Sequence, residues 1–116
     1  MLINRESLYT LRIIYYLSKQ DKNRIIPGRE ISDSENISIN FTFRILGILV
    51  KKGIVESFKG NKGGFRLKKK SLNFYEIINL IQKDPFTLIM EGTGEVETFI
   101  REVQENLKNT FKNKTI

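Results

Sequence analysis

The stretch "SINFTFRILGILVKKGIVESFKGNKGGFRL", residues 38–67, decides the fold. Its first half has the spacing of an amphipathic helix, with Ser38 available as N-cap and Gly53 at the position that glycine prefers after a helix. The short runs "IVESF" and "FRLKK" then flank "KGNKG", which is typical of a β-hairpin with a glycine-rich tip. The sequence therefore predicts a helix that ends at Lys52 and is followed directly by a hairpin.

The predicted helix over residues 38–52 has two distinct faces. One face carries Phe41, Ile45, Ile48, Leu49 and Lys52. The opposite face carries Asn40, Phe43, Arg44, Gly47 and Lys51. A helix that enters a DNA groove must bury one side and display polar groups on the other, and this spacing meets that requirement.

Two further helices are expected before Ser38. The first runs from Arg5 to about Gln20, with these residues at helical spacing: Leu8, Leu11, Ile14, Tyr15 and Ser18. The segment "QDKNRIIPG" breaks it, and residues 29–35 form a short second helix. Asn36 ends that helix, because asparagine tolerates the left-handed conformation that a sharp corner between helices needs. Helix, helix, corner, helix and hairpin is the order of a winged helix-turn-helix.

Residues 73–116 add two more helices to the expected fold. Asn73 caps the first, whose apolar face is Phe74, Ile77, Ile78 and Ile81. Asp84 and Pro85 interrupt it, "FTLIM" is a short apolar run without an assigned state, and "EGTG" is a loop. A long helix from Glu95 to about Lys112 carries one apolar stripe: Val96, Phe99, Ile100, Val103, Leu107 and Phe111. The stripe is either intramolecular core or a dimer contact, and we favour a homodimer because so small a chain offers a long terminal helix little to pack against.

The positive charge is concentrated around the hairpin. The chain of 116 residues has a formal net charge of +7, and residues 36–75 hold nine Lys or Arg against Glu56 alone. Like charges at a tight turn repel one another in the free protein, but a polyanion neutralises them and its counterions are released. A tip that is mostly glycine can also approach a phosphate or a minor groove closely, because glycine has no Cβ. We therefore favour double-stranded DNA as the partner over a merely solvated surface or a membrane.

The residue types that are missing exclude the most common catalytic and metal sites. The chain has no cysteine and no histidine, so the common nucleophile–base pairs and thiolate metal sites cannot be built. We expect no enzyme, no cofactor and no metal. Glu91, Glu95 and Glu97 are more typical of a solvated helix N-terminus than of a hard-metal site. The N-terminus does not have the pattern of a signal peptide and the longest apolar run, "IIYYL", is too short for a bilayer, so we expect a cytoplasmic protein.

From Tyr9 to Leu67 the sequence resembles the small winged-helix bacterial transcription regulators that include IscR, NsrR and CymR. The likeness rests on "YTLRIIYYL" (residues 9–17), "EISDSENIS" (residues 30–38) and above all "KKGIVESFKGNKGGFRL" (residues 51–67). It implies a homodimeric regulator, which we expect to be a repressor, with long C-terminal helices that cross at the dimer interface. We expect a DNA-binding domain over residues 1–83 and a connecting loop with the dimerisation helix over residues 84–116, together forming one compact unit.

The same resemblance implies roles for individual residues. The helix over residues 38–52 would enter the major groove, and the wing, residues 58–70, would meet the adjacent minor groove. The expected DNA-binding residues are Arg5, Asn40, Thr42, Phe43, Arg44, Lys51, Lys59, Asn61, Lys62 and Gly63. Arg44 is either a guanine reader or a phosphate clamp. Phe43 is either a DNA contact or a core residue at the margin of the helix.

The chain departs from the family pattern in two places. Many members hold an iron-sulfur cluster on three cysteines before the long helix, but this chain has none, so cluster-based sensing does not carry over. Members of the CymR type lack a cluster and respond to a protein partner. Phe43 stands where the family usually presents a polar residue such as Glu. The effector, a small molecule or a protein, stays open, as does a ligand pocket near residues 73–94. The alternative function is a protein-interaction adaptor or antagonist that keeps the fold without its own operator.

Overall fold

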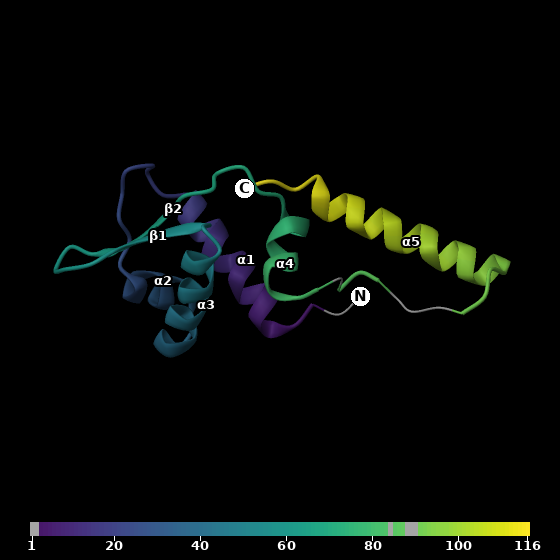
Figure 1. Cartoon of the computed structure of the whole chain (residues 1–116), viewed down its shortest axis with the longest axis horizontal. Coiled ribbons are helices and arrows are strands. Elements are labelled where there is room, and N and C mark those ends of the chain that lie inside the picture. The colour runs from purple at the N-terminus through teal and green to yellow at the C-terminus, as the bar shows by residue number, and fades with distance from the viewer. Residues whose placement is uncertain (1–2, 84, 88–90) are drawn as a thin grey trace.

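The computed structural model describes residues 3–83, 85–87 and 91–116. Its elements are, in chain order, α1 (Arg5–Ser18), α2 (Gly28–Glu35), α3 (Ile39–Lys51), β1 (Val55–Phe58), β2 (Gly64–Leu67), α4 (Phe74–Ile81) and α5 (Glu95–Lys112). Figure 1 shows α1 to α4 gathered in one body, with the β1–β2 hairpin leaving it at one end and α5 extending at the other. The mainly α fold with a small β-hairpin that the sequence predicts is confirmed.

The corner between α2 and α3 is built from local backbone geometry. Asn36 has φ 54° and ψ 46°, the left-handed conformation predicted for it. The Ile37 N–H donates to the Ser32 carbonyl at 3.1 Å, and this bond closes the turn. The Ser38 hydroxyl then accepts from the Phe41 N–H at 3.2 Å, so α3 begins with the N-cap that the sequence predicts.

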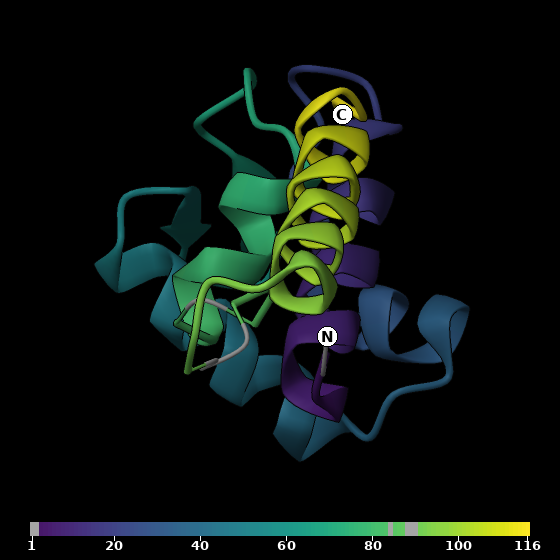
Figure 2. The same ribbon diagram turned by 90° about the vertical axis from the view of Figure 1, so that its right-hand side faces the viewer.

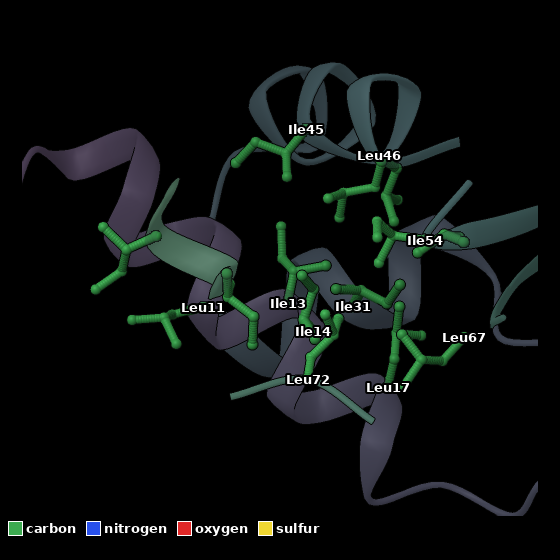
Figure 3. Packing of buried hydrophobic residues seen from close by; sticks show 14 of the residues in the cluster. Leu11, Ile13, Ile14, Leu17, Ile31, Ile45, Leu46, Ile54, Leu67 and Leu72 are labelled. Carbon is green, nitrogen blue, oxygen red and sulfur yellow. The ribbon is translucent and has the colours of Figure 1, made fainter. Parts of the chain in front are cut away.

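One hydrophobic core lies where α1, α2, α3, the hairpin and the start of α4 meet. Figure 3 shows its aliphatic side chains pointing toward one another from these elements: Leu11, Ile13, Ile14, Leu17, Ile31, Ile45, Leu46, Ile54, Leu67 and Leu72. All of them are buried, and Leu46 was not on the apolar face that the sequence predicts for α3. The core therefore holds α3 by its buried face and leaves the opposite face of that helix exposed.

The buried face of α1 differs from the expectation. Leu8 and Tyr15 are exposed, whereas the small polar residues Ser7 and Thr10 are fully buried. Thr10 satisfies its hydroxyl by donating to the Glu6 carbonyl at 2.7 Å, and the Ser7 hydroxyl lies 3.0 Å from the Gln82 side-chain oxygen. Because α1 contacts α2, α3, β2 and α4, it is covered on more than one side, and a single apolar stripe does not describe it.

The hairpin is tied to the helical body by a third segment. β1 and β2 pair antiparallel with Val55 opposite Leu67 and Phe58 opposite Gly64. Beyond them, Ile26 and Phe65 exchange two backbone hydrogen bonds of 2.8 Å each. The residues just before α2 therefore form a short extra rung at the base of the wing, which the sequence analysis did not predict.

The C-terminal part begins as expected and ends with an additional contact. Asn73 and Glu76 form a capping box at the start of α4. After α5, the Phe74 N–H donates to the Lys114 carbonyl at 2.8 Å and the Ile116 N–H to the Leu72 carbonyl at 3.0 Å.

The end of α5 also contacts the body through an aromatic pair. Phe111 packs on Phe86 with ring centroids 4.9 Å apart. Figure 2 views this side end-on, with α5 in front of α1 and α4. Asp84 and residues 88–90 of "FTLIM" lie outside the described residues.

Replacing Asn36 with valine is expected to lower the free energy of unfolding by about 1–2 kcal/mol, because an L side chain other than Asn or Asp is strained in the left-handed region. Urea denaturation monitored by circular dichroism measures the change. Asn36→Gly is the matched control and should lose clearly less stability, since glycine adopts this conformation freely. Equal unfolding midpoints for wild type and Asn36→Val would contradict the described corner.

Candidate nucleic-acid interface

The outward face of α3 is the first half of the candidate interface. The residues predicted for that face are all exposed: Asn40, Phe43, Arg44, Gly47 and Lys51. Thr42 is a correction to the expected DNA-binding set, because its side chain is fully buried on the core side of the helix. Its hydroxyl has no hydrogen-bond partner among the described residues. Thr42 therefore belongs to the packing of α3 and not to its displayed surface.

Arg44 extends from α3 toward the N-terminus of α1. Its guanidinium lies 3.6 Å from the Glu6 carboxylate and 5.7 Å from the centre of the Phe41 ring, while its side chain stays 63% exposed. The ion pair is therefore a surface pair of small energy, which leaves the guanidinium available to a stronger anion. Arg5, the residue before Glu6 at the start of α1, is also exposed.

The tip of the hairpin is the second half of the candidate interface. Lys59, Asn61 and Lys62 are exposed there, and no ion pair involves either lysine within the described residues. The Gly63 N–H donates to the Gly60 carbonyl at 2.9 Å and closes the turn. A Cβ on Gly63 would lie 2.2 Å from the Phe58 carbonyl oxygen, so glycine is required for the shape of the tip. We use the name wing tip for residues 59–63.

The cation at the base of the wing is already neutralised. Arg66 forms a 3.0 Å ion pair with Glu56 on the neighbouring strand, and its guanidinium lies 4.9 Å from the centre of the Phe58 ring. This cross-strand pair stiffens the hairpin. The two lysines of the wing tip differ from Arg66, because their charge is not compensated locally.

Phe43 connects the two halves. Its ring meets that of Phe65 in β2 edge to face, with centroids 5.8 Å apart and an interplanar angle of 64°. The side chain is nevertheless 47% exposed, so it is neither a core residue nor a free surface residue. No local pattern in the sequence predicts this pair, because the two residues are far apart in the chain and meet only once the wing folds back.

Polar contacts that the sequence analysis missed fix α2 on α1 and on the preceding loop. Arg12 pairs with Glu35 through a 3.2 Å contact, and Arg24 pairs with Glu30 in two hydrogen bonds. The Tyr16 hydroxyl also donates to Glu30. Hydrogen bonds from Arg24 and from Tyr16 hold the pKa of the Glu30 carboxyl below its ordinary value of 4.5.

A shallow groove occurs close to the region expected to hold a ligand pocket. It has a volume of about 380 Å³ and is lined by Phe74, Thr110, Phe111, Asn113 and Lys114, where α4 meets the end of α5. Part of the expected region, Asp84 and residues 88–90, lies outside the described residues. No helix among those that are described has both the length and the apolar character to cross a bilayer.

Comparisons with known proteins agree on one family. A family profile described as "Rrf2: Iron-dependent Transcriptional regulator" matches residues 3–115. The chain is 34% identical over 89 residues to the HTH-type transcriptional regulator NsrR of Bacillus licheniformis, a match that covers 75% of this chain and 62% of that protein. It is 33% identical over 72 residues to NsrR of Shouchella clausii, covering 60% of this chain and 48% of that protein. The chain thus spans about half the length of these curated relatives.

Solved structures show the same fold at lower identity. CymR of B. subtilis, titled the global cysteine regulator, superposes with a TM-score of 0.85 at 21% identity, over 99% of this chain and 92% of that one. IscR of T. potens gives a TM-score of 0.81 at 14% identity, over 99% of this chain and 82% of that one. These likenesses confirm the winged helix-turn-helix with a long C-terminal helix.

The residues of this chain do not fit the iron centre that the family description implies. Iron-sulfur clusters take thiolate or imidazole ligands, and the chain contains neither cysteine nor histidine. Within the described ranges, no three acidic residues come close enough together to hold a metal ion.

Glu30→Gln is expected to destabilise the protein at neutral pH but not in acid. Because the folded-state pKa of Glu30 lies below the ordinary value of 4.5, the ionised carboxylate contributes stability above that pH. The contribution is lost as the pH falls through the folded-state pKa. Thermal unfolding at neutral pH and at about pH 3 should therefore show a gap between wild type and Glu30→Gln that closes in acid. Asp33→Asn, on the exposed side of the same helix, is the control, and a Glu30→Gln gap independent of pH would contradict the pairing.

Proposed function

The chain belongs to the Rrf2 family of transcriptional regulators, and on that premise we propose that it binds double-stranded DNA as a homodimer and represses transcription. One observation carries the proposal: the polar face of α3 and the uncompensated lysines of the wing tip are both exposed, and Phe43 and Phe65 join the two elements that carry them. A helix and a ribbon held side by side match the major groove and the minor groove next to it.

In the proposed complex α3 lies in the major groove. Asn40 in its first turn presents an amide that can pair with the N6 and N7 atoms of adenine. Arg44 lies one turn later, and its pair with Glu6 is weak. In the complex its guanidinium can leave Glu6 and donate two hydrogen bonds to a guanine edge or to a phosphate. Lys51 at the far end of the helix and Arg5 at the start of α1 are placed for phosphates on either side of the groove.

The wing tip contacts the adjacent minor groove in this proposal. Gly60 and Gly63 lie beside Lys59 and Lys62 in this turn, so at the two glycines the backbone can approach the sugar-phosphate chain without a Cβ in the way. Since no acidic residue occurs between Glu56 and Glu76, the free protein leaves this charge unneutralised. Phosphates would supply the missing counter-charge, and released counterions would make the binding strongly dependent on salt.

The homodimer is proposed from the exposed stripe of α5. Val96, Phe99 and Val103 are 68%, 63% and 42% exposed, and α5 has no buried residue along its 18 positions. Its C-terminal end is held by the body through Leu107 and Phe111, and the whole helix of 18 residues is about 27 Å long. An amphipathic helix with so little tertiary packing is marginal in water. A second copy of α5, carrying the same stripe, would cover these side chains across a two-fold axis.

The position of Phe43 removes the main reason for proposing a protein-interaction adaptor. An aromatic residue on a displayed helix suggested a protein-binding surface, but the ring has an intramolecular partner in Phe65. We therefore propose DNA binding alone.

Lys59→Ala combined with Lys62→Ala is expected to weaken binding to all duplex sequences and to reduce the slope of log affinity against log salt by about 1.8 per bound protomer. The reason is that each lost phosphate contact releases about 0.9 fewer counterions. Fluorescence anisotropy at several salt concentrations measures both effects. Lys83→Ala combined with Lys114→Ala removes the same charge elsewhere and should leave the slope nearly unchanged. Equal slopes for wild type and the wing variant would place the wing away from the DNA.

Phe99→Glu is expected to weaken the dimer by at least about 100-fold, because each of two symmetric copies would lose the burial of a phenylalanine, worth about 1.5 kcal/mol or more. Sedimentation velocity over a range of concentrations measures the monomer fraction. Asn109→Glu adds the same charge on the polar side of α5 and should leave the dimer intact. A Phe99→Glu protein that stays dimeric, or a wild type that is monomeric throughout, would contradict the proposed interface.

A further inference from the structure

We propose that Phe43 is a positioning residue: through Phe65 it fixes the angle between α3 and the wing, and it does not itself read a base. The inference rests on the proposed DNA-binding function, and it assigns to an exposed aromatic side chain of the recognition helix a role inside the protein. Three features of the described structure carry it.

The first feature is the pair of elements that the Phe43 ring contacts. On one side the ring contacts Phe65 of β2 edge to face at 5.8 Å. On another side it covers Gly28, the first residue of α2, so closely that a Cβ there would lie 2.5 Å from the Phe43 Cζ atom. The ring thus links three elements, α2, α3 and β2, and glycine at position 28 is what leaves room for it.

The second feature is the anchoring of Phe65. Its N–H and carbonyl both bond to Ile26, and a Cβ on the preceding Gly64 would lie only 2.4 Å from the Ile26 carbonyl oxygen. The base of the wing is therefore fixed to the segment that leads into α2. Phe43 contacts this same junction from α3, so its ring is the side-chain link between the recognition helix and the anchored base.

The third feature is the empty space next to the ring. A groove of about 360 Å³ lies between the start of α2 and the outer wing, and the residues that line it include Gly28, Phe43, Phe58 and Gly60. Because the outer wing faces a groove and not a packed surface on this side, the Phe43–Phe65 contact adds to the Ile26–Phe65 rung in resisting a tilt of the wing toward α3.

A small tilt has a large effect at the tip. Strands rise about 3.3 Å per residue, so Asn61, four residues beyond Phe65, lies roughly 13 Å out, and a tilt of about 10° moves it about 2 Å. A shift of that size breaks a hydrogen bond or ion pair between a tip lysine and a phosphate. Phe43 would thus control minor-groove binding from its place on the major-groove helix.

The wing angle can be measured without DNA, because the chain has no cysteine of its own. Spin labels on Lys51→Cys in α3 and Asn61→Cys in the wing tip report the distance between the two elements, with unlabelled protein added in excess to remove contacts between copies. We expect a narrow distribution for the otherwise wild-type protein. Phe43→Leu and Gly28→Ala should each shift or broaden it by about 2 Å or more.

Gly28→Ala separates positioning from base reading, because it keeps Phe43 and every DNA-facing group while its methyl displaces the ring. Gly47→Ala is the matched control: it is the same substitution within a helix, and a Cβ there meets nothing within 4 Å. Its distance distribution should equal that of wild type. Unfolding midpoints confirm that each variant is folded. An unchanged distribution in Gly28→Ala and Phe43→Leu would overturn the proposal.

A binding cycle then tests the consequence for DNA. Gly28→Ala should weaken DNA binding by about the same factor as Lys59→Ala with Lys62→Ala. The variant that combines all three changes should bind no more weakly than either, because both sets of changes remove the same contact between the wing and the DNA. Fully multiplicative effects, or a Phe43→Leu variant that changes the preferred base while the lysines keep their full effect, would overturn the proposal in favour of base reading. A wild type that binds no duplex would instead refute the proposed function, and the label distances would still decide the role of Phe43.

Discussion

Two backbone hydrogen bonds between Ile26 and Phe65 set the geometry on which the candidate interface depends. They attach the wing to the segment that leads into α2, and α2 is itself held on α1 by the Arg12–Glu35 pair and on the preceding loop by the Arg24–Glu30 pair. A two-stranded hairpin alone is marginal in water, so without this third rung the wing would have no fixed direction. With it, the wing and α3 act as parts of one rigid surface.

The distribution of paired and unpaired charge separates the cations that connect parts of the fold from those that we propose to contact DNA. Arg12, Arg24 and Arg66 each face a carboxylate and connect two elements of the fold. Lys59 and Lys62 have no such partner within the described structure, although they repel one another across a tight turn. Arg44 is intermediate, because its pair with Glu6 is exposed and long. This gradient from paired base to unpaired tip supports the proposal that the wing tip contacts phosphate.

Local signals in the sequence predicted most of the fold. Ser38, Asn36 and Asn73 act within four residues of themselves, so their capping and corner roles could be inferred and are confirmed. The displayed face of α3 followed from helical spacing in the same way. Contacts between distant segments could not be inferred: the third rung at Ile26, the burial of Thr42 and the covering of α1 on several sides depend on tertiary packing. The DNA-binding roles, the dimer and the division at residue 83 remain predictions.

The most direct test of the central claim is selection from a pool of random duplexes by the purified protein at low and at moderate salt. An interface made of paired recognition helices and wings predicts strong enrichment of a two-fold symmetric sequence, with half-sites about one helical turn apart and with recovery that falls steeply as salt rises. Recovery of no preferred sequence at either salt concentration would contradict the account.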